Sequence, residues 1–234
     1  MNMLHLLKAP DFVSMINLIF GMAAIFFAFS GAFGAAAACL LIAAAADGVD
    51  GYVARKTSGG PLGEHIDSLV DVVSFGVAPA VIVYCMSENI ISVVFVCFYL
   101  ICGILRLARY NAMPHKKEEY AGIPITGAAV ALSMFVLILF NLEKTNFSIP
   151  YDIEIMFVFM FVLSLLMIST IPYSKVMKKE TFAVLIILFV GTIASLFVSN
   201  ALIVIFPAIL GFLMLIYLIS PLIGLISKKK SVQL

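Results

Sequence analysis

The sequence predicts an all-α membrane protein, a polytopic bundle of about eight transmembrane helices. Of the 234 residues, 64% are hydrophobic and only 12% are charged, and the mean hydropathy is +1.18. These values lie outside the range of soluble globular domains. The net charge of +1 gives no reason to expect a nucleic acid as partner.

The expected spans are the apolar segments of about 20 residues that lie between helix-breaking and polar runs. They lie near residues 12–30, 33–56, 63–86, 90–112, 122–142, 151–172, 181–198 and 200–226. A tight turn around Ser199 and Asn200 divides the last two. We treat residues 1–234 as one integral membrane domain, in which 10–130 form the catalytic part and 131–234 add further helices.

The distribution of basic residues predicts the orientation. Of the 14 Lys and Arg residues, all but Lys144 fall on one side of the eight-span arrangement. Because basic residues are retained in cytoplasmic loops, this side is expected to be cytosolic. The even number of spans then places both termini in the cytosol. We expect a multi-pass protein of the cell membrane whose loop 56–63 faces the cytosol.

One short window carries an unusual density of charge: 47-DGVDGYVARKTSGGPLGEHIDSLVD-71. Asp47 and Asp50 share one helical face with Gly51, by i, i+3, i+4 spacing, and Asp67 and Asp71 share another face by i, i+4 spacing. At about 1.5 Å of rise per residue, Asp47 lies roughly 14 Å and Asp71 roughly 12 Å from the cytosolic end of its helix. A short hairpin loop therefore brings four carboxylates to a similar depth.

Four carboxylates inside a bilayer require compensation, since each ionised group there costs about 2.5 to 3.5 kcal/mol on insertion scales. Oxygen ligands at close spacing suit hard divalent ions, of which Mg²⁺ and Mn²⁺ are the first candidates and Ca²⁺ a further one. The helical phase points His65 away from the carboxylates. Ion pairing with Arg55, Arg106 and Arg109 is the alternative, but it does not explain the clustering. Gly51 leaves room for a substrate beside the carboxylates, and Arg55, one turn nearer the cytosol, is placed to meet an anion.

The same residues carry a family resemblance. The pattern Asp47-x-x-Asp50-Gly51-x-x-Ala54-Arg55, followed after seven residues by Gly63-x-x-x-Asp67-x-x-x-Asp71, resembles the signature of the CDP-alcohol phosphatidyltransferases. All eight signature positions are filled in register.

The resemblance implies transfer of a phosphatidyl group from a CDP-linked lipid to an alcohol, with release of CMP. It implies that Asp47, Asp50, Asp67 and Asp71 hold two divalent cations and that Asp71 is also the general base. It further implies that Gly51 and Arg55 border the cytidine diphosphate and that the protein is a homodimer. Two metal ions and one base suit this chemistry.

Other segments resemble the phosphatidylserine synthase branch, which implies L-serine as the acceptor. Pro10-Asp11-x-x-Ser14-x-x-Asn17 resembles the PNxxTxxN opening of that branch, with Asp11 and Ser14 replacing Asn and Thr. Two later segments, 106-RLARYN-111 and 122-GIPITGAA-129, also resemble this branch. The resemblance thus covers residues 10 to 130. The residues expected to bind the CDP-lipid are Asp11, Ser14, Asn17, Gly51, Arg55, Ser58 and Gly63.

Arg106 and Arg109, at a cytosolic helix end, have two interpretations. They anchor the helix by the positive-inside rule, or at least one of them binds the serine carboxylate or a substrate phosphate. Glycerol 3-phosphate, inositol phosphate and amino alcohols remain alternative acceptors. An ion-coupled transporter is the alternative from another class, since intramembrane carboxylates also mark ion paths, but no inverted repeat of the hairpin follows.

Overall fold

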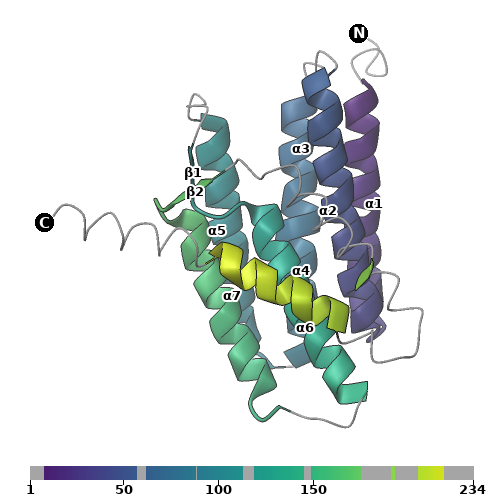
Figure 1. Cartoon of the computed structure of the whole chain (residues 1–234), viewed down its shortest axis with the longest axis vertical. Coiled ribbons are helices and arrows are strands. Elements are labelled where there is room, and N and C mark those ends of the chain that lie inside the picture. The colour runs from purple at the N-terminus through teal and green to yellow at the C-terminus, as the bar shows by residue number, and fades with distance from the viewer. Residues whose placement is uncertain are drawn as a thin grey trace, which may run out of the picture.

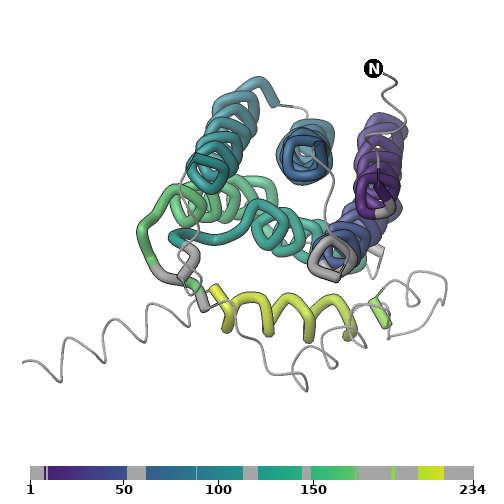
Figure 2. Tube along the Cα trace, turned by 90° about the horizontal axis from the view of Figure 1, so that it is seen from above, coloured from purple at the N-terminus to yellow at the C-terminus, as the bar shows by residue number. Residues whose placement is uncertain are grey.

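The computed structural model describes residues 8–56, 62–87, 89–112, 119–144, 149–174, 191–192 and 205–218. They form a bundle of helices, most of which run along the long axis of the molecule (Figures 1 and 2). Within the described ranges, five helices are long and apolar enough to cross a bilayer: Pro10–Phe29, Phe33–Gly51, Gly63–Ser87, Ser92–Ala112 and Ile125–Glu143. Their positions confirm the first five predicted helices and a multi-pass membrane protein.

The first two helices form a hairpin. Helix α1 (Ala9–Phe29) has a proline in its first turn, where the missing N–H costs no helical hydrogen bond. The chain reverses at Gly31, whose φ of 72° favours glycine. Helix α2 (Phe33–Lys56) returns along α1. Its alanine-rich first half includes the fully buried Ala36 and Ala37, and these small side chains let the two helices approach closely.

The third span is one continuous helix with a change of geometry in the middle. It consists of α3 (Gly63–Asp71), a π-helical turn η2 (Val72–Val77) and α4 (Ala78–Ser87). In the π turn the amide of Ala78 donates to the carbonyl of Val73, five residues earlier. This span packs against α1 on one side and against α5 on the other, as Figure 2 shows.

The remaining long helices complete the core. Helix α5 (Ser92–Ala112) packs against α4 and α7 (Asp152–Ile168), and α6 (Ile125–Lys144) packs against α2 and α7. Of the five spanning helices, α6 is the most buried. It therefore lies at the centre of the bundle, where its N-terminal end can contribute to a site formed by α2 and α3.

A short antiparallel strand pair, which the sequence did not predict, joins two loops. Strand β1 (Glu119–Ala121) pairs with β2 (Pro172–Ser174), with Tyr120 opposite Tyr173. As a result, the fifth predicted helix begins three residues later than expected, and the sixth ends four residues earlier. Helix α7 ends at Ile168 because the chain after it joins β2, and α6 begins at Ile125 because Gly122, with a φ of 79°, and Pro124 precede it.

The C-terminal part agrees only in part with the expected spans. The predicted helix 181–198 lies outside the described residues except for 191 and 192. Within the predicted helix 200–226, residues Ile205–Leu218 form a shorter apolar helix. This helix, yellow in Figures 1 and 2, lies crosswise on one side of the bundle. At Gly211 it comes close to Met134 and Ile138 of α6.

Candidate metal centre and its surroundings

Helices α2 and α3 bring three of the four predicted aspartates together. Each of Asp47, Asp67 and Asp71 offers a carboxylate oxygen, and these oxygens lie within 4.8 Å of one another. Asp71 is only 6% exposed. The Oδ1 atoms of Asp67 and Asp71 are buried without a hydrogen-bond partner among the described residues. Because such oxygens are costly inside a bilayer, the donor set fits a hard divalent cation.

The fourth aspartate, Asp50, lies outside this group of three and is bound to α1. It is 5% exposed, and its Oδ2 accepts a hydrogen bond of 2.8 Å from the hydroxyl of Ser14. The contact joins two residues that the sequence had assigned to separate motifs, since Ser14 belongs to the opening segment and Asp50 to the family signature.

Helix α6 contributes a residue that sequence reasoning missed. The hydroxyl of Thr126 donates to Oδ2 of Asp47 at 3.2 Å. Thr126 lies one residue into α6, at the point where the central helix meets α2. The signal for it was the segment 122-GIPITGAA-129, which suggested a branch of the family but no role for the threonine. The hydrogen bond makes Thr126 part of the site.

The start of α1 lies beside the start of α3. Asp11 is 2% exposed and accepts a hydrogen bond of 2.7 Å from the backbone amide of Lys8. A Cβ atom on Gly63 would lie 3.2 Å from Oδ1 of Asp11, so glycine lets the two helix ends approach. These two predicted residues are therefore neighbours.

The remaining residues predicted to bind the CDP-lipid differ in their surroundings. Asn17 is fully buried, and its amide nitrogen and oxygen have no hydrogen-bond partner in the described part of the chain. A Cβ atom on Gly51 would meet nothing within 4 Å, so the space expected beside it is present. Arg55 lies in α2 with its side chain outside the described part, and Ser58 lies outside the described residues.

Arg109 has a structural role. Its guanidinium donates to the carbonyl of Ala121, which ends β1, and to the carbonyls of Met167, Ile168 and Ser169 at 3.1 to 3.2 Å. The last carbonyls of a helix have no partner within the helix, and a cation there is favourable. Arg109 therefore fastens the end of α5 to the end of α7 and to the segment that leads into α6.

Arg106 lies one turn earlier on α5. Its guanidinium lies over the ring of Tyr110, 5.5 Å from the ring centroid. Its charge acts on Asp47 and Asp71. Of the two arginines, Arg106 is thus the one that lies in the electrostatic field of the cluster.

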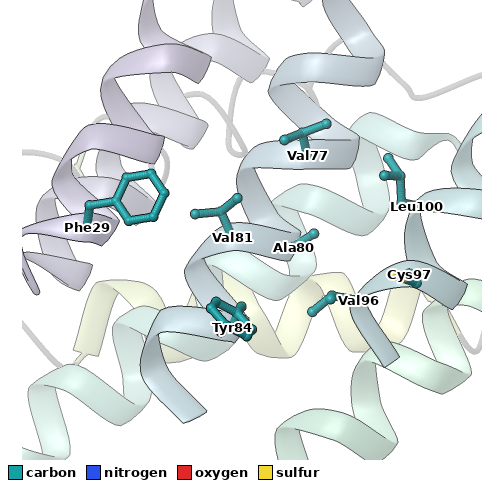
Figure 3. A pocket seen from close by; sticks show the side chains of 8 residues that line it. All are labelled: Phe29, Val77, Ala80, Val81, Tyr84, Val96, Cys97 and Leu100. Carbon is teal, nitrogen blue, oxygen red and sulfur yellow. The ribbon is translucent and has the colours of Figure 1, made fainter. Parts of the chain in front are cut away.

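An apolar groove in the opposite half of the bundle is distinct from this site. It is lined by Phe29 at the end of α1 and by side chains of η2, α4 and α5, and its volume is about 290 Å³ (Figure 3). Tyr84 borders it near the end of α4. The groove contains no charged side chain, so it cannot balance the charge of a nucleotide.

Comparison with known proteins decides the family. The family model described as CDP-alcohol phosphatidyltransferase matches residues 7–158, more than half of the chain. The chain belongs to the CDP-alcohol phosphatidyltransferase family. The matched range contains every aspartate of the cluster as well as Ser14 and Thr126. Membership of a transferase family also decides against the transporter alternative.

Three curated relatives illustrate the similarity. The chain is 37% identical over 172 residues to the archaetidylserine synthase of Methanothermobacter thermautotrophicus, covering 71% of this chain and 70% of that protein. It is 34% identical over 176 residues to a CDP-diacylglycerol–serine O-phosphatidyltransferase of Methanocaldococcus jannaschii, covering 74% and 77%. With the protein of that name from Helicobacter pylori strain J99 it shares 36% identity over 180 residues, covering 73% of each chain.

Proposed function

We propose that this CDP-alcohol phosphatidyltransferase transfers the phosphatidyl group of a CDP-linked lipid to the hydroxyl of L-serine and releases CMP. The names of the relatives support serine as the acceptor. The observation that carries the reaction type is the group of three aspartates whose oxygens lie within 4.8 Å of one another. The relatives' names include both an archaetidyl and a diacylglycerol lipid, so the proposal covers either kind of CDP-lipid.

The site would hold divalent cations. Asp47, Asp67 and Asp71 present oxygens close enough to share an ion, and Asp50 would complete a set for two ions, of Mg²⁺ or Mn²⁺. Bound ions of this kind supply charge stabilisation to the attacking and leaving oxygens of a phosphoryl transfer. The buried Oδ1 atoms of Asp67 and Asp71 that lack a hydrogen-bond partner in the described structure support this assignment.

Asp71 would act as the general base. Its carboxylate takes the proton of the serine hydroxyl as the serine oxygen bonds to the phosphorus that carries the lipid. The bond from that phosphorus to the bridging oxygen of the pyrophosphate breaks, and CMP leaves with this oxygen. Direct attack is proposed because the signature segment contains no Cys, and the hydroxyl of Ser68 donates to the backbone carbonyl of Glu64 rather than to a base.

The CDP-lipid would bind along α1 and the α2 to α3 hairpin. The free space beside Gly51 gives the diphosphate access to the cluster. The unpartnered amide of Asn17 can bond a polar atom of the nucleotide or a water molecule. Ser14 would orient Asp50. The other residues proposed for this subsite are Asp11, Arg55, Ser58 and Gly63.

For the serine carboxylate we propose Arg106, whose guanidinium lies over the ring of Tyr110, one turn before Arg109 on α5. Arg109 is the weaker of the two predicted candidates, since its guanidinium donates to four backbone carbonyls. Replacing each by Ala separates them: loss of Arg106 should raise the KM for serine. An unchanged KM in both variants would remove both arginines from the acceptor site.

The proposed membrane arrangement follows from the distribution of basic residues. It has eight spans, both termini in the cytosol and the aspartates open to the cytosolic side of the cell membrane. The chain would act as a single domain and as a homodimer. Introducing a cysteine at each terminus in turn, in a variant without the four native cysteines, and testing its labelling by a membrane-impermeant thiol reagent from either side of sealed vesicles checks the orientation. Labelling of the two termini from opposite sides would exclude an even span number.

The decisive experiment for the reaction is CMP release by the purified protein in lipid nanodiscs. The reaction contains CDP-diacylglycerol, Mn²⁺ and either serine, glycerol 3-phosphate or inositol phosphate. We expect release with serine that stops when EDTA is added. Release only with a phosphorylated acceptor would refute the serine assignment, and no release with any alcohol would refute the proposed activity for this chain.

A further inference from the structure

The π-helical turn follows directly after Asp71 in the third span. It comprises Val72–Val77. At its end the amide of Ala78 donates to the carbonyl of Val73, whereas in an α-helix it would donate to the carbonyl of Ser74. Such turns are rare, hold an extra residue per turn and are frequent at functional sites. The extra residue in the turn therefore sets how α3, which carries Asp67 and Asp71, is rotated relative to α4.

Pro79 explains why the helix widens at this place. In an α-helix the carbonyl of Phe75 would accept a hydrogen bond from the amide of residue 79, but proline has no N–H and its ring would clash with that carbonyl. The π turn removes the clash. Because Pro79 has no N–H, the Phe75 carbonyl lacks its usual donor, in a membrane span where water cannot replace it.

Tyr99 of α5 supplies the missing donor. Its hydroxyl bonds to the carbonyl of Phe75 at 3.0 Å, and the side chain is fully buried. The turn is also bound on its other side, where the hydroxyl of Ser74 donates to the carbonyl of Asn17 in α1 at 3.2 Å. A Cβ atom on Gly21 would lie 2.8 Å from Cα of Ser74, so glycine is required for this close approach. The turn is therefore held between α1 and α5.

We propose that Tyr99 is a positioning residue for the aspartate cluster, because it stabilises the π turn that sets the direction of Asp71. If the turn relaxed to α geometry, α3 would rotate relative to α4 by the angle of one residue, roughly 100°. That rotation would carry Asp67 and Asp71 away from Asp47. Tyr99 acts through the backbone, at a distance from the substrates, and the inference rests on the proposed metal centre.

The test measures Mn²⁺ binding to the purified protein in nanodiscs by electron paramagnetic resonance, without substrates. Tyr99→Phe is expected to weaken Mn²⁺ binding roughly 3- to 10-fold, the scale of one buried hydrogen bond. The matched control is Tyr84→Phe on the groove side of α4, where the side chain is 44% exposed. It should bind Mn²⁺ as the unmodified protein does.

A second variant separates positioning from mere stability. Pro79→Ala restores an N–H that can donate to the Phe75 carbonyl, so it permits α geometry. We expect an unfolding temperature that is unchanged or higher, together with weaker Mn²⁺ binding. Unmodified Mn²⁺ affinity in both Tyr99→Phe and Pro79→Ala would overturn the inference while leaving the metal centre intact. If the unmodified protein itself binds no Mn²⁺, the metal centre fails, and the inference fails with it.

Discussion

Replacing Asp71 by asparagine is the sharpest test of the proposed chemistry. The substitution keeps the volume of the side chain and one oxygen, so it should leave no cavity. It removes the charge and the ability to accept a proton. Because Asp71 is 6% exposed and its Oδ1 has no hydrogen-bond partner among the described residues, solvent offers no ready substitute base at this position.

The expected loss follows from the role of the base. General-base catalysis contributes about 10²- to 10⁴-fold, which corresponds to roughly 2.7 to 5.4 kcal/mol at about 1.36 kcal/mol for each factor of ten. Asp47 and Asp67 remain, so Mn²⁺ binding should weaken but persist. Binding of the CDP-lipid should also persist, because Ser14 and Asn17 on α1 are untouched.

The assay compares CMP release, Mn²⁺ binding and CDP-lipid binding for the same preparation. Glu154→Gln is the matched control, since Glu154 is an exposed carboxylate in the first turn of α7, outside the cluster. We expect a loss of turnover of at least 10²-fold only for Asp71→Asn. Turnover near the unmodified rate would refute Asp71 as the base, whatever happens to metal binding.

Three further substitutions test the surroundings of the cluster. Ser14→Ala should lower CMP release roughly 3- to 10-fold, because it removes the hydrogen bond that orients Asp50. The control, Ser30→Ala in the turn after α1, should have no effect. Equal rates of CMP release in the two variants would contradict a role for the contact between Ser14 and Asp50. Thr126→Val should weaken Mn²⁺ binding by a similar factor. Ser133→Ala is the control, since the Ser133 hydroxyl donates to the carbonyl of Ala129 within α6. Arg109→Lys should lower the unfolding temperature and leave the KM for serine unchanged, because an ammonium cannot reach all four carbonyls. A raised KM at an unchanged unfolding temperature would instead indicate that Arg109 belongs to the acceptor site.

Much of the fold was predictable because bilayer thickness restricts what a span can be. Apolar segments of about 20 residues mark helices directly, and the first five lie where the sequence placed them. The ends of helices were less predictable. The segment 151–172 is mostly apolar after its acidic first turn, yet α7 ends at Ile168. The chain beyond that residue pairs with β1 and is bound by Arg109, partners that lie about 50 to 60 residues away in sequence.

The cluster itself was predictable from spacing, since i, i+3 and i, i+4 patterns place carboxylates on one helical face. Its partners were not. Neither the contact of Ser14 with Asp50 nor that of Thr126 with Asp47 follows from periodicity, because each depends on how two helices distant in sequence pack. The two arginines of α5 looked equivalent in sequence. Their different surroundings arise from the bound ends of α7 and β1, which only the tertiary structure reveals.

The π turn has a consequence for how this membrane span can change during evolution. Residues after Pro79 lie in the half of the helix that is remote from the aspartates, so an insertion or deletion near Ser87 would alter only the length of that half. An insertion between Asp67 and Val77 would instead turn the ligand-bearing half relative to the half packed on α1 and α5. The helix therefore has a tolerant half, which can adapt to membranes of different thickness, and an intolerant half, whose length is fixed by chemistry.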